Sequence, residues 1–178
     1  MNYGQGDLVV TYSRGYRRKD FVIDGGFEGY TCTGFCFSES YANWIGTSSP
    51  GGVNDTIFIH YVPFAHSGST VAVMGSGTGD DALAGTLTPV APLATVAGKQ
   101  YIITFFHYSG YSPPSDEQDA FVDIMWNGNV VATITPGYSP WTYYSFNVTG
   151  AGKDVLAFHG GKAPAWSFLD DVHVFRIW

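Results

Sequence analysis

Acidic side chains stand inside two apolar runs, one near each end of the 178-residue chain. Residues 21–29 read Phe-Val-Ile-Asp-Gly-Gly-Phe-Glu-Gly and include Asp24 and Glu28, whereas residues 167–175 read Ser-Phe-Leu-Asp-Asp-Val-His-Val-Phe. A carboxylate buried in a strand without a partner costs several kcal/mol, and neither run contains a Lys or Arg residue. A hard cation shared by both runs would remove this cost. Calcium is the natural candidate because it binds carboxylate and backbone oxygens at flexible geometry.

The composition is that of a folded, acidic chain. Hydrophobic residues make up 45% and charged residues 13%, which argues against disorder. The net charge of −7, with only 8 Lys and Arg residues, argues against nucleic-acid binding. We expect the basic cluster at residues 14–19 to be a solvated N-terminal face. No apolar run approaches the roughly 20 residues that span a bilayer, and the first residues do not read as a signal peptide.

The two cysteines, Cys32 and Cys36, are separated by three residues. This spacing predicts a small-loop disulfide in an oxidising compartment, with free thiols as the alternative. A zinc site would need two more suitable ligands, and the neighbouring sequence offers none. Two triplets, at residues 54–56 and 147–149, match the N-glycosylation pattern and favour a secreted, extracellular or cell-wall protein.

Short β-type runs recur along the chain with turn residues between them, and no segment has a sustained helical period. The predicted strands are residues 8–12, 20–23, 56–62, 70–74, 84–87, 100–108, 120–126, 130–135, 142–148, 154–158 and 167–178. Asn127-Gly128 favours a type I′ hairpin turn. The pattern predicts an all-β jelly-roll sandwich of two antiparallel sheets. Residues 1–20 are expected to be an N-terminal extension that adds an edge strand, and residues 21–178 form the domain.

Strand alternation predicts an aromatic outer surface. Phe106 and Tyr108 fall on one face of the strand at residues 100–108, and Asp123 marks the outward face of the next strand. With Tyr143, these residues would form a ligand-binding surface. The alternative is that a loop or residues 1–19 cover the rings.

Several short motifs, in order along the chain, resemble the galactose-binding-like jelly rolls, above all carbohydrate-binding module families four, nine and twenty-two and related cell-wall domains of plants and fungi. They are Asp-Gly-Gly-Phe-Glu at residues 24–28, His-Ser-Gly-Ser at 66–69, Gly-Lys-Gln-Tyr at 98–101, Trp-Asn-Gly at 126–128 and Phe-Leu-Asp-Asp-Val at 168–172. The resemblance covers residues 21–178.

The resemblance implies a structural calcium ion that joins the two ends of the domain. Carried over residue by residue, its ligands would be the carbonyl of Gly26, the carboxylates of Glu28 and Asp170, and carbonyls in the turn around Ser67 and Gly68. Asp24 replaces the usual Asn and is expected to be a turn residue or to support the ligands. The alternative places Glu28 and Asp170 at exposed strand ends, solvated and unpaired.

The resemblance also implies non-catalytic, lectin-like binding of a polysaccharide or glycan. Sugar binding needs flat aromatic faces together with polar groups. We expect Trp44 or Trp141 at the rim of the surface formed by Phe106, Tyr108, Asp123 and Tyr143. Trp166 also lies in a turn-like sequence, and the loop at residues 111–117 is expected to form one wall.

Two other function classes stay open. The segment at residues 8–12 could pair with a neighbouring copy in a self-assembling adhesive protein. A glycoside hydrolase would need a pair of carboxylates, and candidates occur at residues 80, 81, 116, 117 and 119. These acids lie in polar loops, where we expect them to be solvated, and no common catalytic motif is present.

Overall fold

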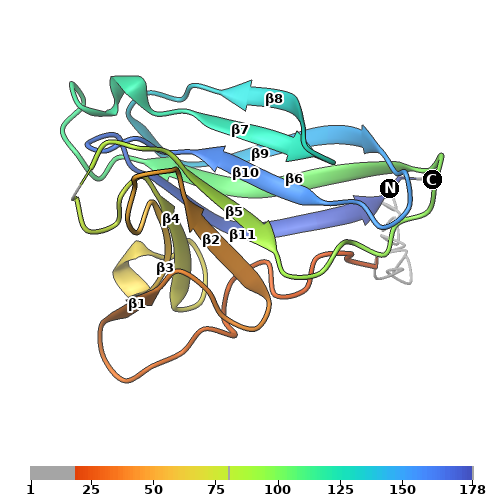
Figure 1. The fold of residues 1–178 in the computed structure, drawn as a ribbon, viewed down its shortest axis with the longest axis horizontal. Coiled ribbons are helices and arrows are strands. Elements are labelled where there is room, and N and C mark those ends of the chain that lie inside the picture. The colour runs from red at the N-terminus through yellow and green to blue at the C-terminus, as the bar shows by residue number, and fades with distance from the viewer. Residues whose placement is uncertain (1–18, 80, 178) are drawn as a thin grey trace, which may run out of the picture.

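The recurrent β-type runs form two antiparallel sheets packed face to face (Figure 1). A computed structural model describes residues 19–79 and 81–177. In spatial order, the six-stranded sheet contains β1 (Cys36–Ser38), β3 (Thr56–His60), β4 (Thr70–Met74), β11 (Ser167–Arg176), β6 (Gln100–Ser109) and β9 (Ser139–Thr149). The five-stranded sheet contains β2 (Trp44–Ser48), β5 (Gly85–Pro89), β10 (Leu156–Gly160), β7 (Val122–Trp126) and β8 (Asn129–Ile134). Two short 3-10 helices, η1 (Val62–Phe64) and η2 (Glu117–Asp119), lie in loops.

The sheets confirm the predicted all-β sandwich, although the strand boundaries differ in places. The strand at residues 70–74 has the predicted bounds, and those at 100–108 and 167–178 correspond to β6 and β11. The predicted strand at 20–23 is irregular and joins β11 by one bridge, Asp20 to Phe175. Two strands, β1 and β2, were not predicted because their short, partly polar sequences show no clear alternation. The predicted strand at 8–12 and most of the 1–20 extension lie outside the described residues.

The β7–β8 hairpin turns at Asn127 and Gly128, as predicted. Both residues have positive φ, 53° and 78°, which is the conformation that a type I′ turn requires. Asn127 also ties the hairpin to the loop before β10, because its side-chain amide donates to Asp154 Oδ1 at 2.5 Å. The turn sets the register next to it, and the pairing of β7 with β8 then shifts between Ile124 and Met125.

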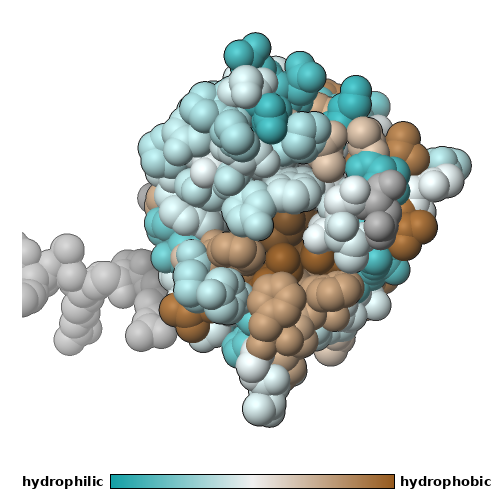
Figure 2. All heavy atoms as spheres, turned by 90° about the vertical axis from the view of Figure 1, so that its left-hand side faces the viewer, coloured by the Kyte–Doolittle hydropathy of each residue, from teal (hydrophilic) through white to brown (hydrophobic). Residues whose placement is uncertain are grey.

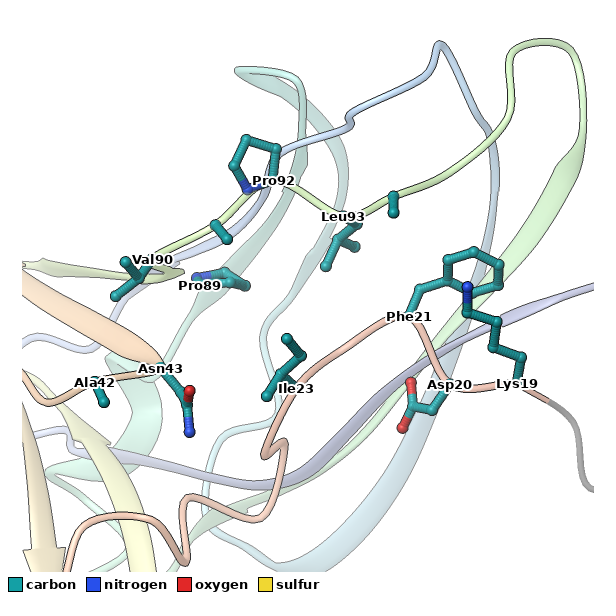
Figure 3. Close-up of a pocket in the computed structure, with 12 residues that line it drawn as sticks. Lys19, Asp20, Phe21, Ile23, Ala42, Asn43, Pro89, Val90, Pro92 and Leu93 are labelled. Atoms are coloured by element: carbon teal, nitrogen blue, oxygen red, sulfur yellow. The ribbon is translucent and has the colours of Figure 1, made fainter.

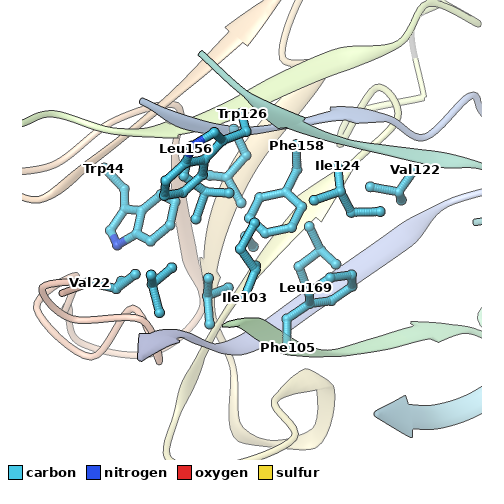
Figure 4. Packing of buried hydrophobic residues seen from close by; sticks show 14 of the residues in the cluster. Val22, Trp44, Ile103, Phe105, Val122, Ile124, Trp126, Leu156, Phe158 and Leu169 are labelled. Atoms are coloured by element: carbon cyan, nitrogen blue, oxygen red, sulfur yellow. The ribbon is translucent and has the colours of Figure 1, made fainter. Parts of the chain in front are cut away.

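The core lies between the two sheets. Ile103, Phe105 and Leu169 from the six-stranded sheet meet Ile124 and Phe158 from the five-stranded sheet (Figure 4). Each of these side chains is completely buried, and burial of one such group stabilises the fold by about 1.5–3 kcal/mol. Because side chains alternate along a strand, the residues between them on β6 and β11 face outward.

The two acidic runs lie side by side. The N–H of Val172 donates to the carbonyl of Gly25 at 2.9 Å. A Cβ at position 25 would lie 1.7 Å from the Val172 carbonyl oxygen, so only glycine permits this approach. Nearby, the β11–β6 pairing changes register between Asp170 and His173, and Asp171 has φ 50°, as expected of a bulge.

A disulfide joins Cys32 to Cys36 and confirms the predicted small-loop bridge. It closes the segment that leads into β1. Within the described residues, no helix is long and apolar enough to cross a membrane.

We expect the Asp20–His173 pair to make stability pH-dependent. His173 Nδ1 lies 2.6 Å from Asp20 Oδ2, and this hydrogen bond raises the pKa of His173 above its ordinary value. A raised histidine pKa stabilises the fold below the unfolded pKa of roughly 6.5, and the stabilisation is lost as pH rises through the folded pKa. Asp20→Asn should therefore lower the melting temperature more at about pH 5.5 than at about pH 8.5.

Thermal unfolding followed by circular dichroism measures this difference. Asp119→Asn is the matched control, since Asp119 is an exposed loop acid. An equal loss of melting temperature at both pH values in Asp20→Asn would contradict the prediction.

Candidate functional site

Asp170 is a fully buried carboxylate at the centre of the two acidic runs. Its Oδ2 accepts hydrogen bonds from the backbone N–H groups of His66 (2.8 Å) and Ser67 (3.1 Å), and its Oδ1 accepts one from Asp171 N–H (2.7 Å). Burial raises the pKa of Asp170 to about 7, although the N–H donors oppose that shift. The alternative that placed Asp170 at an exposed, solvated strand end is therefore wrong.

Glu28 is exposed but paired. Its Oε1 accepts hydrogen bonds from the N–H groups of Ser69 (2.7 Å) and Thr70 (2.9 Å). A Cβ at Gly68 would lie 2.3 Å from the same oxygen, and Gly68 has φ +64°, so glycine is required there. The turn at residues 66–70 thus holds both Glu28 and Asp170 through its backbone.

Three carboxylate side chains surround Gly26. A Cβ at this position would lie 3.6 Å from Asp171 Oδ1, 3.9 Å from Asp170 Oδ1 and 4.0 Å from Glu28 Cγ. The structure therefore brings together the whole predicted ligand set: Gly26, Glu28, Ser67, Gly68 and Asp170. We call this set, with Asp171, the acidic junction.

The acidic junction suits a hard cation, because its donors are oxygens and its charge is negative. In the part of the chain that the structure describes, no three His, Cys, Asp or Glu side chains are arranged to hold a metal by themselves. Backbone oxygens would have to complete a cation site here. Asp24 lies in a turn with φ 56°, and its Oδ2 accepts hydrogen bonds from the N–H of Gly29 and the hydroxyl of Tyr41.

His66 connects the acidic junction to an aromatic surface. Its Nδ1 lies 2.7 Å from Asp171 Oδ2. Its ring stacks on Phe106, with centroids 3.7 Å apart and planes 18° apart, and meets Trp141 at 5.2 Å. The sequence motif around His66 was noted for its turn, and this second role was missed because it depends on the position of β6.

Four predicted ligand-binding rings lie together on the outer face of the six-stranded sheet. Phe106 and Tyr108 project from β6, and Trp141 and Tyr143 project from the neighbouring β9. Phe106 meets Tyr143 at 5.5 Å, and Tyr108 meets Trp141 at 5.5 Å. Tyr143 is 54% exposed, and the other three are partly buried. We call these four residues the aromatic platform.

The platform has polar neighbours. Ser145 and Asn147 continue the same face of β9 beyond Tyr143, and both are exposed. Burial raises the pKa of Tyr108, so its phenol stays protonated at neutral pH.

Two predicted members of this site lie elsewhere. Asp123 is on β7 in the other sheet, where it accepts a hydrogen bond from the Thr133 hydroxyl at 2.5 Å. The expectation that it shares a surface with Phe106 was wrong because strand alternation does not say which sheet a strand joins. Trp44 is fully buried against Phe27, with ring centroids 5.1 Å apart, so it forms no rim.

A hollow of about 250 Å³ lies next to the platform. Figure 2 shows apolar surface around a hollow at this end of the molecule, where the loops gather. It is lined by Phe35, Ile59, Phe64, Val73, Gly77, Tyr111, Trp166 and Phe168. Tyr111 lies at the start of the loop that was predicted to form a wall. Phe168 was not predicted to line a site, although its outward position in the alternation of β11 could have indicated it.

A second hollow, of about 290 Å³, lies beside the start of the described chain (Figure 3). Its walls are mainly apolar and include Phe21, Ile23 and Leu93. Two polar side chains at its edge have partners: Asp20 pairs with His173, and the Asn43 amide donates to Asp24 at 3.2 Å. Lys19 also lines the hollow, with its Nζ 4.9 Å from the centroid of the Phe21 ring.

The expectation that the loop acids are solvated holds for the exposed Asp119 but is wrong for Glu117. Glu117 is fully buried, and its Oε1 accepts a hydrogen bond from Ser112 N–H at 2.8 Å. Burial raises the pKa of Glu117. Asp81 accepts hydrogen bonds from the N–H groups of Val53 and Leu83. Residue 80 is not among the described residues.

No protein-family profile and no curated protein match the sequence. Solved structures do match. One is a family 61 carbohydrate-binding module in complex with β-1,4-galactotriose, with TM-score 0.57 and 15% identity over 89% of this chain and 99% of that chain. Another is the C-terminal family 22 carbohydrate-binding module of a Clostridium thermocellum protein, with TM-score 0.53 and 11% identity over 85% and 91% of the two chains.

The chain has the jelly-roll fold of a carbohydrate-binding module. This confirms the predicted fold class and the resemblance drawn from the motifs. An arabinose-bound α-L-arabinofuranosidase also matches, with TM-score 0.59 and 10% identity over 88% of this chain, but the match covers 26% of that chain. The matched region is thus a small part of the enzyme.

We expect the buried Asp170 to make the metal-free protein less stable at high pH. Its folded pKa of about 7 lies above the ordinary aspartate pKa of 3.8, so the folded state retains a proton that the unfolded state has lost. Stability should fall as pH rises from roughly 4 to 7, by on the order of 4 kcal/mol in the limit. Urea unfolding in chelator at about pH 5 and pH 8 measures this loss.

Asp170→Asn should remove most of the pH dependence, because the amide does not titrate. Asp119→Asn is the control, since Asp119 is an exposed acid that is not part of the junction. If Asp170→Asn keeps the wild-type slope of stability against pH, another group carries the effect.

Proposed function

We propose that this chain is a non-catalytic module that binds a polysaccharide or glycan on the aromatic platform. The observation that carries the proposal is the exposed Tyr143 beside Phe106 and Trp141, on the outer sheet face of a chain with the fold of a carbohydrate-binding module. The family 61 and family 22 structures supply the fold-level support. The Cys32–Cys36 disulfide is consistent with an extracellular or cell-wall location.

The platform has the chemistry that sugars need. The C–H face of a pyranose ring packs on an aromatic face, and the hydroxyls require polar partners. Tyr143 supplies both an exposed ring and a phenol, and Ser145 and Asn147 supply further polar groups on the same face of β9. The negative charge of the chain, −7, does not oppose binding of a neutral saccharide.

We also propose that the acidic junction binds a structural calcium ion. Glu28, Asp170 and backbone oxygens around Gly26 and Ser67 would hold it. Bound calcium would neutralise carboxylates that now surround Gly26 and would link the N-terminal run to β11. Through His66, the same junction would position Phe106 and Trp141. The calcium would thus support the platform without touching the sugar.

Loss of a platform ring should weaken glycan binding. Tyr143→Ala and Trp141→Ala should each reduce affinity by about tenfold or more, since an aromatic contact contributes roughly 0.5–1.5 kcal/mol beyond its buried area. A polysaccharide array identifies the ligand, and isothermal titration calorimetry with an oligosaccharide of that ligand measures the loss.

Asp123→Ala is the matched control, because Asp123 faces outward from the opposite sheet. It should bind as tightly as the wild type. The proposal fails if no plant, fungal or bacterial polysaccharide binds, or if Asp123→Ala loses as much affinity as Tyr143→Ala.

Calcium should stabilise the fold. At a concentration 100 times the dissociation constant, the gain is about 2.7 kcal/mol, which corresponds to a rise of roughly 5–11 °C in melting temperature for a chain of this size. Differential scanning calorimetry with calcium and with chelator measures the rise. Glu28→Gln and Asp170→Asn should abolish it, whereas Glu39→Gln, an exposed acid outside the junction, should not. An unchanged melting temperature in wild-type protein would exclude the site.

A further inference from the structure

The hollow next to the platform has walls of a different chemistry from a sugar site. Five aromatic rings surround it: Phe35, Phe64, Tyr111, Trp166 and Phe168. Aliphatic side chains from β3 and β4 complete its surface, and none of its lining residues is charged. The only polar side-chain groups among its lining residues are the phenol of Tyr111 and the indole N–H of Trp166. Each sugar hydroxyl left without a partner there would cost about 1–3 kcal/mol. The hollow therefore favours an apolar group over a sugar ring.

The size and the ring arrangement suit one aromatic group. The volume is about 250 Å³, and an apolar cavity of roughly 150 Å³ is enough to bind benzene. Phe64 meets both Tyr111 and Phe168 edge-on, each with centroids 5.6 Å apart, and Tyr111 meets Trp166 at 4.9 Å. A further ring can join such a cluster in stacked or edge-to-face geometry.

The hollow and the platform are continuous. Tyr108 of the platform packs edge-on against Phe168 of the hollow, with centroids 5.6 Å apart, and its ring centroid lies 5.5 Å from that of Trp141. A saccharide on Trp141 and Tyr143 would therefore lie next to the mouth of the hollow. A substituent on that saccharide could enter it without leaving the surface of the protein.

The mouth of the hollow includes a residue held by the disulfide. Phe35 lies inside the loop closed by Cys32 and Cys36, is 60% exposed and meets Tyr61 edge-on at 5.7 Å. Because most of the Phe35 ring is exposed, the ring contributes little to folding and is available to contact an apolar ligand. Phe37, two residues later on β1, is also exposed (45%) but does not line the hollow.

From these observations we infer that the hollow is a subsite for an aromatic substituent carried by the glycan, such as a hydroxycinnamoyl ester. The inference rests on the proposed function, since it assigns the ligand's sugar to the platform and its aryl group to the hollow. It predicts that the protein distinguishes aryl-substituted from unsubstituted forms of the same saccharide.

The test compares a feruloylated oligosaccharide with the same oligosaccharide after alkaline removal of the ester, by calorimetry on the full chain. The ester should bind at least about tenfold more tightly to the wild type. Phe35→Ala and Tyr111→Ala should remove that difference and leave binding of the de-esterified sugar unchanged. Both residues are at least half exposed, so these variants should fold. Phe37→Ala is the matched control and should keep the difference.

A second measurement separates the subsite from the platform. Ethyl ferulate, which carries no sugar, should bind the wild type and Tyr143→Ala equally, and should not bind Phe35→Ala, in saturation-transfer NMR. If the saccharide binds in a Tyr143-dependent way but its ester brings no gain and ethyl ferulate does not bind, the subsite is excluded and the proposed function stands. If ethyl ferulate binds but no saccharide does, the proposed function fails, and the link between aryl group and glycan fails with it. An equal loss in Phe37→Ala and Phe35→Ala would also overturn the inference.

Discussion

The buried carboxylate of Asp170 is the constraint on which much of the structure depends. Its burial is tolerated because three backbone N–H groups, two of them from the turn before β4, point at its oxygens. The same turn binds Glu28 through two more N–H groups. The carboxylates thus bring the N-terminal run, the turn and β11 to one place, and a change in the charge of Asp170 would act on all three.

The acidic junction also has a consequence for the outer sheet face. His66 belongs to the turn that binds Asp170, yet its ring stacks on Phe106 and contacts Trp141. A side chain of the turn that contacts the junction therefore also contacts two rings of the aromatic platform. Under the proposal that the junction binds calcium, the ion would act on the platform through the turn that carries His66, without contacting the ligand.

Sequence reasoning predicted much of the fold and part of the site. The Asn127-Gly128 turn and β4 follow from local signals, because turn residues and alternation are visible in short segments. The set of calcium ligands around Gly26 came instead from the family resemblance, and its role as a ligand set stays a prediction. Phe106, Tyr108 and Tyr143 were also predicted together, since they fall on outward positions of two strands. The expectation that Asp123 lies beside Phe106 was wrong. Alternation shows that a side chain points outward, but it does not show from which of the two sheets it points. Trp44 was misjudged because Phe27, its partner, is distant in sequence.

By itself, the sequence determined that this chain is an acidic β-sandwich with carboxylates at both ends and aromatic residues on outward strand positions. These properties depend on residue type and on the period of two in a strand. Only the tertiary structure decided which strands are neighbours. In the observed strand order, β9 pairs with β6, whereas β7 belongs to the opposite sheet. Tyr143 therefore lies on the platform, and Asp123 does not. The tertiary structure also brings the two acidic runs together in one junction. There, backbone N–H donors from residues about 100 positions away in the chain compensate for the burial of Asp170.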